Sequence, residues 1–431
     1  MWGNNFSFKE GTAIGCGLIA TGLMLQFSVG SINWQLTAWP ANAMLLALIV
    51  VMLVAMHLLR KRVYLFRWLS THTSAISSMA FTVVVTVILG LIAQSSSPEA
   101  PWWNRLLSSW PFVLVYMWLT VSLGLTILRV GSHRWTWRTC AFMLNHLGLF
   151  IALTTATLGN ADMQRLKMSV GQNALGYGPQ AIAYDELSGD SATVEMDFAL
   201  TLNKFTIDQY PAKLAVIDSL GQTLPEGQPQ QLVIEDSLAS GNLLGWDVQV
   251  LKSLDTAAKM QRPDPNDSTQ MVANYVPMQL DRATALREGG AYAVYVKATN
   301  AQSGENREGW VSCGSFLPFS FSVLPLDDCH SIAMLQREPR KYTSHVTVYV
   351  REGDDARCLG DTIIEVNRPI EVNGWKIYQL SYEEQYGPAT RYSVFELVRD
   401  PWLPWVYAGI LMMLAGAITL FFTSNPKTRK P

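Results

Sequence analysis

The strongest constraint on the fold lies near the end of the chain, where a polar, turn-rich segment runs directly into a long apolar one. Strand-like sequence extends to Arg399-Asp400-Pro401, and an apolar stretch near residues 402–423 follows at once. A stretch of this length is sufficient to cross a hydrocarbon core of roughly 30 Å as a helix. The sequence therefore predicts a folded polar domain that is joined to a membrane helix with almost no linker.

Five more apolar stretches, each of about 19–22 residues, precede this domain. We place them near residues 11–30, 41–59, 74–94, 110–128 and 139–158. The first stretch lacks the basic start and the small-residue cleavage site of a signal peptide. We therefore expect a polytopic α-helical membrane protein with a large β-rich extracytoplasmic domain inserted before the last transmembrane helix. The expected parts are a membrane domain over residues 1–159, the β-rich domain over 160–400, and the sixth helix with a short cytoplasmic tail over 401–431.

Basic residues predict the orientation, because loops rich in Lys and Arg stay on the cytoplasmic side of a membrane. The loops after the second and fourth spans and the tail after the sixth are basic, with Arg60, Lys61, Arg62, Arg67, Arg129, Arg134, Arg138, Lys427, Arg429 and Lys430. The opposite loops, 31–40 and 95–109, carry only Arg105 as a basic residue. We expect both termini on the cytoplasmic side of a bacterial inner membrane and residues 160–400 in the periplasm.

The charge of the chain is divided between the two predicted parts. Residues 160–400 hold 20 of the 32 Lys and Arg and 32 of the 34 Asp and Glu, which gives a net charge of −12 there and +10 elsewhere. An acidic outer domain argues against nucleic-acid binding. Lipid is the expected surrounding of the apolar spans. The sequence has no nucleotide-binding loop and no metalloprotease or esterase motif. Asp and Glu are nearly absent from the spans, which argues against a proton-driven pump.

The outer domain has the sequence pattern of β-strands. Alternation or enrichment in β-branched and aromatic residues occurs at residues 193–211, 292–300, 345–350 and 390–398. Turns are indicated at Glu226-Gly227 and Asn373-Gly374. We expect an antiparallel sandwich-like or open-sheet domain with long irregular connections.

Three cysteines, Cys313, Cys329 and Cys358, lie in this outer domain. An oxidising compartment permits a disulfide among them, but with three thiols one pair at most forms and one thiol remains. The chain has no Cys-x-x-Cys and hence neither a thioredoxin-type redox site nor a covalent attachment motif for haem.

Three histidines, His57, His72 and His146, lie at the cytoplasmic level of three predicted spans. An imidazole at membrane depth is costly without a partner and indicates a functional site, and neutral imidazole is a common axial ligand of haem iron. Each residue also has a structural interpretation. His57 would be an interfacial residue, His72 a polar helix start, and His146 a hydrogen-bond partner of a neighbouring helix.

Several short motifs follow one another from about residue 70 to the end of the chain. They are Asn145-His146-Leu147-Gly148, residues 198–202, 205–208, Tyr210-Pro211, 339–349, 366–369, 374–379 and Arg399-Asp400-Pro401. In combination, order and spacing they resemble the ResB family, also called CcsB, the cytochrome c biogenesis proteins of the system II pathway.

The resemblance implies a function that composition alone does not. Proteins of this family work with a second membrane protein, CcsA, to carry haem b outward and attach it to the Cys-x-x-Cys-His motif of apocytochrome c. The Trp-rich haem-handling motif belongs to CcsA, and Trp102-Trp103-Asn104 is not its counterpart. This chain would therefore be part of a holocytochrome c synthase whose attachment site lies on the partner, and no catalytic residue is assigned to it.

The resemblance also implies a haem ligand, because one histidine at the inner end of an early span is thought to ligate haem opposite a CcsA histidine. His72 fits that description best, with His57 and His146 as the alternatives. Arg129 and Arg134 are candidate partners of the haem propionates. A second function stays open, in which the chain binds no haem and serves as a structural assembly subunit that stabilises CcsA and docks substrate. A secondary transporter fits less well, because no inverted repeat is visible.

Overall fold

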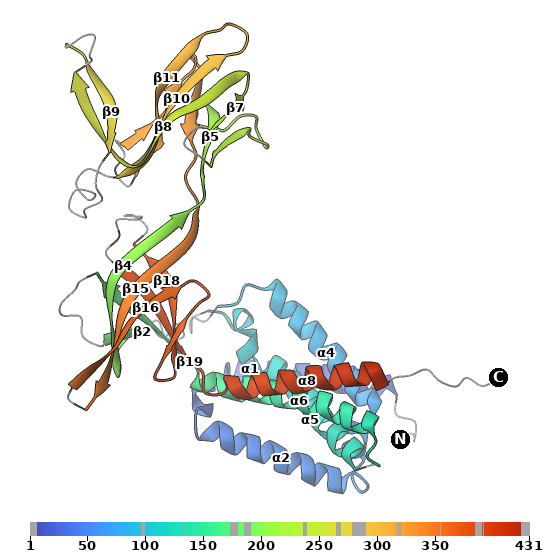
Figure 1. The fold of residues 1–431 in the computed structure, drawn as a ribbon. Coiled ribbons are helices and arrows are strands. Elements are labelled where there is room, and N and C mark those ends of the chain that lie inside the picture. Colours follow the sequence, from blue (N-terminus) through green and yellow to red (C-terminus); the bar gives the residue numbers. More distant parts are fainter. Residues whose placement is uncertain are drawn as a thin grey trace. The chain divides into compact units, whose positions relative to one another are not determined.

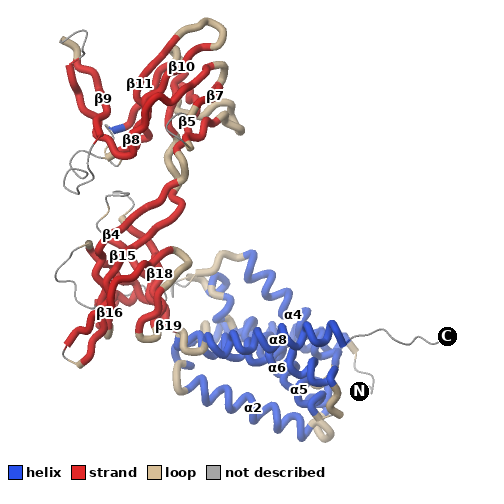
Figure 2. Tube along the Cα trace, in the orientation of Figure 1, coloured by secondary structure: helices blue, strands red, loops and turns tan. Residues whose placement is uncertain are grey.

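The structure is a computed structural model of the chain. It describes residues 7–95, 100–132, 134–172, 180–184, 191–235, 239–263, 269–277, 290–315, 317, 320–353, 355–383, 390 and 392–423. The chain divides into two compact units. A helical unit combines Met1–Leu166, Ala183–Ala192 and Val398–Pro431, and a β unit combines Lys167–Ile182 and Thr193–Leu397. Figure 2 shows the long helices in the first unit and most of the strands in the second.

In the described part of the chain, six helices are long and apolar enough to cross a membrane. They are α1 (Phe8–Val29), α2 (Ala41–Leu59), α4 (His72–Leu91), α5 (Trp110–Gly131), α6 (Trp137–Gly159) and α8 (Leu403–Thr423) (Figure 1). A short helix, α3 (Tyr64–Leu69), lies between α2 and α4 in the sequence. Together with the β-rich region between α6 and α8, these helices confirm the predicted fold class.

Helix α4 begins two residues before the predicted span near 74–94, and its first residue is His72. Thr71 is the N-cap, and its hydroxyl accepts a hydrogen bond from the backbone N–H of Ser74 at 3.3 Å. The cap provides an acceptor for one of the N–H groups that have no partner in the first turn of a helix. A hydropathy pattern misses these first residues because they are polar.

Helix α5 is the centre of the helical unit, where it contacts α1, α2, α4 and α6. Half of its most apolar window is buried inside the protein, whereas the corresponding share is 11% for α2 and for α8. Val115 and Leu125 of α5 are fully buried. The apolar faces of the outer helices are left to contact lipid, because a lipid chain is as apolar as a leucine side chain.

Helices α6 and α8 pack at unusually short range, although more than 240 residues separate them in the sequence. A Cβ atom on Gly148 of α6 would lie 2.4 Å from the backbone nitrogen of Met413 and 2.5 Å from the carbonyl oxygen of Gly409. The Asn145 amide donates a hydrogen bond of 2.9 Å to the carbonyl of Met413. Small residues and an interhelical hydrogen bond of this kind are the usual means of joining helices in a membrane.

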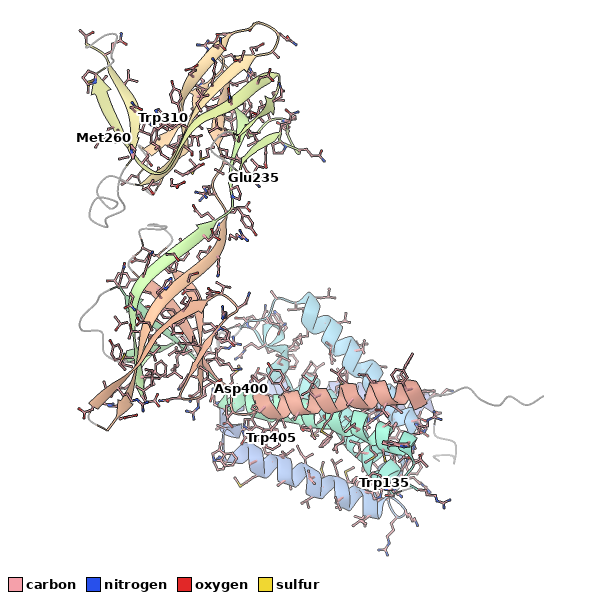
Figure 3. The ribbon with its side chains drawn as sticks, viewed as in Figure 1. Trp135, Glu235, Met260, Trp310, Asp400 and Trp405 are labelled. Carbon is pink, nitrogen blue, oxygen red and sulfur yellow. The ribbon has the colours of Figure 1, made fainter. Side chains whose placement is uncertain are left out.

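Tryptophans mark the two ends of the bundle. Trp135, before α6, and Trp405, in the first turn of α8, lie at opposite ends in Figure 3, and each side chain is 62% exposed. Indole rings are enriched at the two membrane interfaces, because they combine an apolar body with a polar N–H. The distribution agrees with helices that span a bilayer from end to end.

The described strands form four sheets. One sheet has the order β17-β18-β19-β1-β2-β3, and another has β16-β15-β4. The remaining two have the orders β13-β14-β5-β6 and β12-β11-β10-β8-β7, with β9 paired to β8. Their bounds are β1 Gln164–Gly171, β2 Gln180–Tyr184, β3 Ser191–Glu195, β4 Phe198–Gln209, β5 Ala212–Asp218, β6 Gln231–Ile234, β7 Ser240–Leu243, β8 Trp246–Pro263, β9 Met271–Pro277, β10 Ala291–Asn300, β11 Asn306–Cys313, β12 Phe321–Ser322, β13 Leu324–Pro325, β14 His330–Met334, β15 Pro339–Glu352, β16 Asp355–Glu365, β17 Ile370–Val372, β18 Trp375–Tyr382 and β19 Tyr392–Arg399.

Strands pair antiparallel in β1–β2, β10–β11, β8–β10, β15–β16, β4–β15, β17–β18 and β8–β9, as the alternating sequence pattern predicts. Strands β17 and β18 are joined by the predicted turn Asn373-Gly374, and both residues have positive φ (48° and 80°). Two-residue hairpins with this backbone favour Asn-Gly, because glycine and asparagine tolerate the left-handed region best. Strands β5 to β14 lie between β4 and β15 in the sequence and share their own buried core, which includes Leu214, Val250 and Ile332.

A single carboxylate joins three segments at one end of the helical unit. Asp162, just after α6, accepts hydrogen bonds from the backbone N–H of Trp39 (2.7 Å), the amide of Asn42 (2.7 Å) and the indole N–H of Trp402 (2.6 Å). The Asn42 amide also donates to the Leu158 carbonyl at 3.2 Å. These bonds hold the start of α2, the end of α6 and the start of α8 together.

Candidate functional site

His72 lies at the start of α4 with an exposed side chain, and one residue of α5 contacts it. Arg129 places Nη2 3.2 Å from Nε2 of His72, while its Nη1 donates a hydrogen bond of 2.6 Å to the Ser70 carbonyl. A guanidinium can only donate hydrogen bonds, so Nε2 must be the acceptor and the proton of the neutral ring is on Nδ1. The Nε2 lone pair of His72 therefore points to the arginine.

A buried cluster of hydroxyl and indole groups, which begins at Ser74 two residues after His72, fixes α4 against α5. Ser74 and Ser122 are 0% and 1% exposed, and their hydroxyl oxygens lie 3.1 Å apart. The indole N–H of Trp118 donates to Ser74 Oγ at 3.1 Å, and the ring stacks on buried Trp68. Because buried polar groups are costly to leave unpaired, this cluster favours one arrangement of the two helices and holds the first turn of α4 beside α5.

His57, at the end of α2, has neighbours at both ring nitrogens. Arg60 Nη1 lies 2.8 Å from Nδ1 and 3.1 Å from Nε2, and the Ser132 hydroxyl lies 3.2 Å from Nε2. Ser132 follows Arg129 by three residues, so the C-terminal end of α5 contacts both His57 and His72. A polar partner at each nitrogen is the arrangement expected of an interfacial histidine.

His146 of α6 makes a different set of contacts. Its Nδ1 lies 3.1 Å from the Phe142 carbonyl, and its ring stacks on Phe142 with the centroids 3.7 Å apart. A carbonyl only accepts, so Nδ1 carries the proton and Nε2 holds a lone pair. Such an orientation is common in metal-ligating histidines, so His146 stays chemically competent. The structure does not connect it by hydrogen bonds to His57 or His72 among the described residues.

Within the described part of the chain, no group of three or more His, Cys, Asp or Glu side chains is arranged to hold a metal ion. Haem makes a smaller demand on a protein, because the porphyrin supplies four ligands and each face of the iron needs one axial ligand. A single accessible imidazole with an unprotonated nitrogen meets this demand on one face. The exposed His72 fits the group as one half of such a site.

The three outer cysteines form no disulfide in the structure. Cys313 is on β11, Cys329 precedes β14 and Cys358 is on β16, and all three are free thiols. A disulfide among them, which the sequence permits, stays a prediction. Burial raises the pKa of the Cys313 thiol, which lowers its reactivity because only the thiolate is a strong nucleophile.

The turn before β14 holds a carboxylate that accepts several hydrogen bonds, Asp327. Backbone N–H groups of Cys329 and His330 both donate to Asp327 Oδ1 at 2.8 Å, and His330 Nδ1 lies 2.9 Å from Oδ2. Donation from the Cys329 backbone, together with the His330 contacts, holds the pKa of Asp327 below its usual value. These bonds are local to the turn, so the site is structural.

Sequence reasoning identified His72 but missed its contact with Arg129 as well as the Ser74–Ser122 pair. Arg129 and His72 are 57 residues apart, so no local pattern reports their contact. The available signal is positional: the basic end of one span and the polar start of another lie on the same side of the membrane by the predicted topology.

Comparison with known families gives one match. The model of the ResB-like family matches residues 278–390, which include the strands from β10 to β18. A comparison with curated proteins found no match. The matched segment does not include the membrane histidines, so their role rests on geometry. The chain thus combines helices that can span a membrane with a segment, residues 278–390, that matches the ResB-like family.

Proposed function

We propose that the chain is a subunit of the system II machinery that carries haem b across the membrane and attaches it to apocytochrome c. In this proposal a CcsA-type membrane protein is its partner and holds the attachment site. The observation that supports it best is the exposed imidazole of His72, whose Nε2 bears a lone pair at the end of a membrane helix. The ResB-like segment supports the same pathway.

His72 would supply one axial imidazole and the partner the other. The side chain is exposed at the surface of the helical unit, so a second protein can approach it. His146 and His57 are only half exposed, and both ring nitrogens of His57 already have polar neighbours. Neutral imidazole holds iron reversibly, which suits a protein that passes haem on.

The predicted orientation supports a cytoplasmic position for this contact. In the described residues, Arg60, Lys61, Arg62 and Arg67 lie between α2 and α4, and Arg134 lies between α5 and α6. By the positive-inside rule this end faces the cytoplasm of a bacterial inner membrane, and the β unit faces the periplasm. The β unit would present apocytochrome c to the partner, and lipid would surround the exposed apolar faces of α2, α4 and α8.

The test is an absorption spectrum in the Soret region of the chain purified together with its CcsA-type partner. A bis-imidazole spectrum that becomes high-spin in His72→Ala, but not in His146→Ala, supports ligation by His72. An unchanged spectrum in His72→Ala removes His72 from the mechanism. If no membrane histidine affects the bound haem, the chain is a structural assembly subunit that stabilises the partner and docks substrate.

A further inference from the structure

We infer that Arg129 is a displaceable cap on His72: in the unloaded protein its guanidinium occupies the Nε2 lone pair, and it must release that nitrogen before His72 can bind iron. The inference rests on the proposed function, because it concerns the same imidazole. It assigns Arg129 as a positioning residue that controls how readily His72 becomes a ligand.

The two hydrogen bonds of the Arg129 guanidinium differ in strength. Nη1 donates to the carbonyl of buried Ser70 at 2.6 Å, whereas Nη2 meets the exposed Nε2 of His72 at 3.2 Å. The shorter, more buried bond is the stronger of the two, since short charge-assisted hydrogen bonds are stronger and solvent screens exposed ones. A small rotation of the Arg129 guanidinium about its hydrogen bond to Ser70 can therefore expose Nε2 of His72 without moving a helix.

Competition for Nε2 follows from the chemistry of the two partners. An arginine N–H and a metal ion both need the same lone pair, and Nδ1 cannot replace it while it carries the proton. Ligation by His72 therefore requires the His72–Arg129 bond to break. The cost is one exposed, charge-assisted hydrogen bond.

The released arginine gains a second use. Among the described residues, Arg129 makes no ion pair with a carboxylate, so its charge is uncompensated by the chain itself. Guanidinium groups bind carboxylates well, so the uncovered N–H groups can receive a haem propionate. The same residue then opposes ligation of an uncharged porphyrin and favours a porphyrin that carries carboxylates.

The experiment compares two porphyrins on the complex of this chain with its CcsA-type partner. Iron protoporphyrin and its dimethyl ester are each titrated into the wild type, Arg129→Gln and the matched control Arg62→Gln, and dissociation constants are read from the Soret band. Arg62 is an exposed arginine between α2 and α3 whose guanidinium makes no hydrogen bond among the described residues. A conservative Arg129→Lys variant shows whether charge alone is sufficient.

The cap predicts opposite effects on the two porphyrins. Loss of an exposed charge-assisted hydrogen bond should let Arg129→Gln bind the dimethyl ester about three- to tenfold more tightly than the wild type. The preference of the wild type for the free acid over the ester should shrink in Arg129→Gln and persist in Arg62→Gln. Weaker binding of the ester, or an unchanged ester constant in a folded Arg129→Gln protein, overturns the cap.

A second measurement separates this inference from the proposed function. Carbethoxylation of His72, followed by mass spectrometry of the haem-free complex, should be several times faster in Arg129→Gln than in the wild type or Arg62→Gln. Equal rates overturn the cap even if His72 ligates haem. If His72 reacts faster in Arg129→Gln but the Soret spectrum does not depend on His72, the His72–Arg129 contact is confirmed. That result overturns both the role of this contact in haem ligation and the proposed function.

Discussion

Substituting Gly148 by alanine tests the close approach of α6 and α8 in the simplest way. The added Cβ would lie 2.4 Å from the Met413 nitrogen, whereas ordinary contacts of this kind begin at 3.4 Å, so the helices must separate locally by about 1 Å. The Met413 nitrogen and the Gly409 oxygen both belong to the backbone, so no change of side-chain rotamer can relieve the clash. Overpacking of this kind costs about 1–3 kcal/mol.

Alanine also favours the helix over glycine by about 1 kcal/mol, which opposes the loss. Gly90→Ala provides the matched control, because Gly90 also lies within a helix and a Cβ there would meet no atom within 4 Å. The difference between the two variants therefore isolates the packing cost of about 1–3 kcal/mol.

The assay is the thermal unfolding of the full chain in detergent, followed by tryptophan fluorescence and size exclusion. Gly148→Ala should unfold several degrees below Gly90→Ala. Equal midpoints for the two variants would refute the short interhelical distance, because no other property of the substitution differs in the required direction.

Two further predictions concern the β unit. Tyr275→Phe removes the hydroxyl that donates to the Ser320 carbonyl, and it should destabilise the β unit by about 1–3 kcal/mol in denaturant unfolding. The control Tyr210→Phe, at an exposed ring, should change the stability little. Equal losses of stability in the two variants would contradict the role of the Tyr275 hydrogen bond. The folded-state pKa of Asp327 is depressed, so its stabilising effect is present above an unfolded pKa of about 3.9 and is lost as the pH falls through the folded value. Below a pH of about 3.9, the unfolding midpoint of Asp327→Ala should therefore fall less steeply with acid than that of the wild type. The control Asp328→Ala should keep the wild-type dependence on pH. Identical pH profiles for all three proteins would show that the Asp327 turn does not contribute to the pH dependence of folding.

The sequence was sufficient for the number of spans and for the character of the outer unit, because both depend on local patterns. Apolar length reveals a membrane helix, and alternation reveals strands such as β10 and β19. The Asn373-Gly374 turn was also predictable, since its backbone conformation selects those two residues.

The arrangement of the helices was not predictable in the same way. Lipid-facing and core-facing residues are equally apolar, so hydropathy cannot show that α5 is central or that α8 returns to α6. Close packing there depends on Gly148 and Gly409. Small residues are common in membrane helices, so neither glycine indicates in the sequence which helix it packs against. The His72–Arg129 contact has the same origin, because it joins the ends of two helices through tertiary packing.

The bonds of Asp162 have a mechanical consequence. Strand β1 begins two residues after Asp162, and β19 ends three residues before Trp402, so both strands join the helices close to one hydrogen-bonded carboxylate. Strands β1 and β19 are also neighbours in one sheet. Because Asp162 bonds to Trp39, Asn42 and Trp402, a force applied at either of these two junctions is shared by the ends of α2, α6 and α8, and no single helix carries it alone.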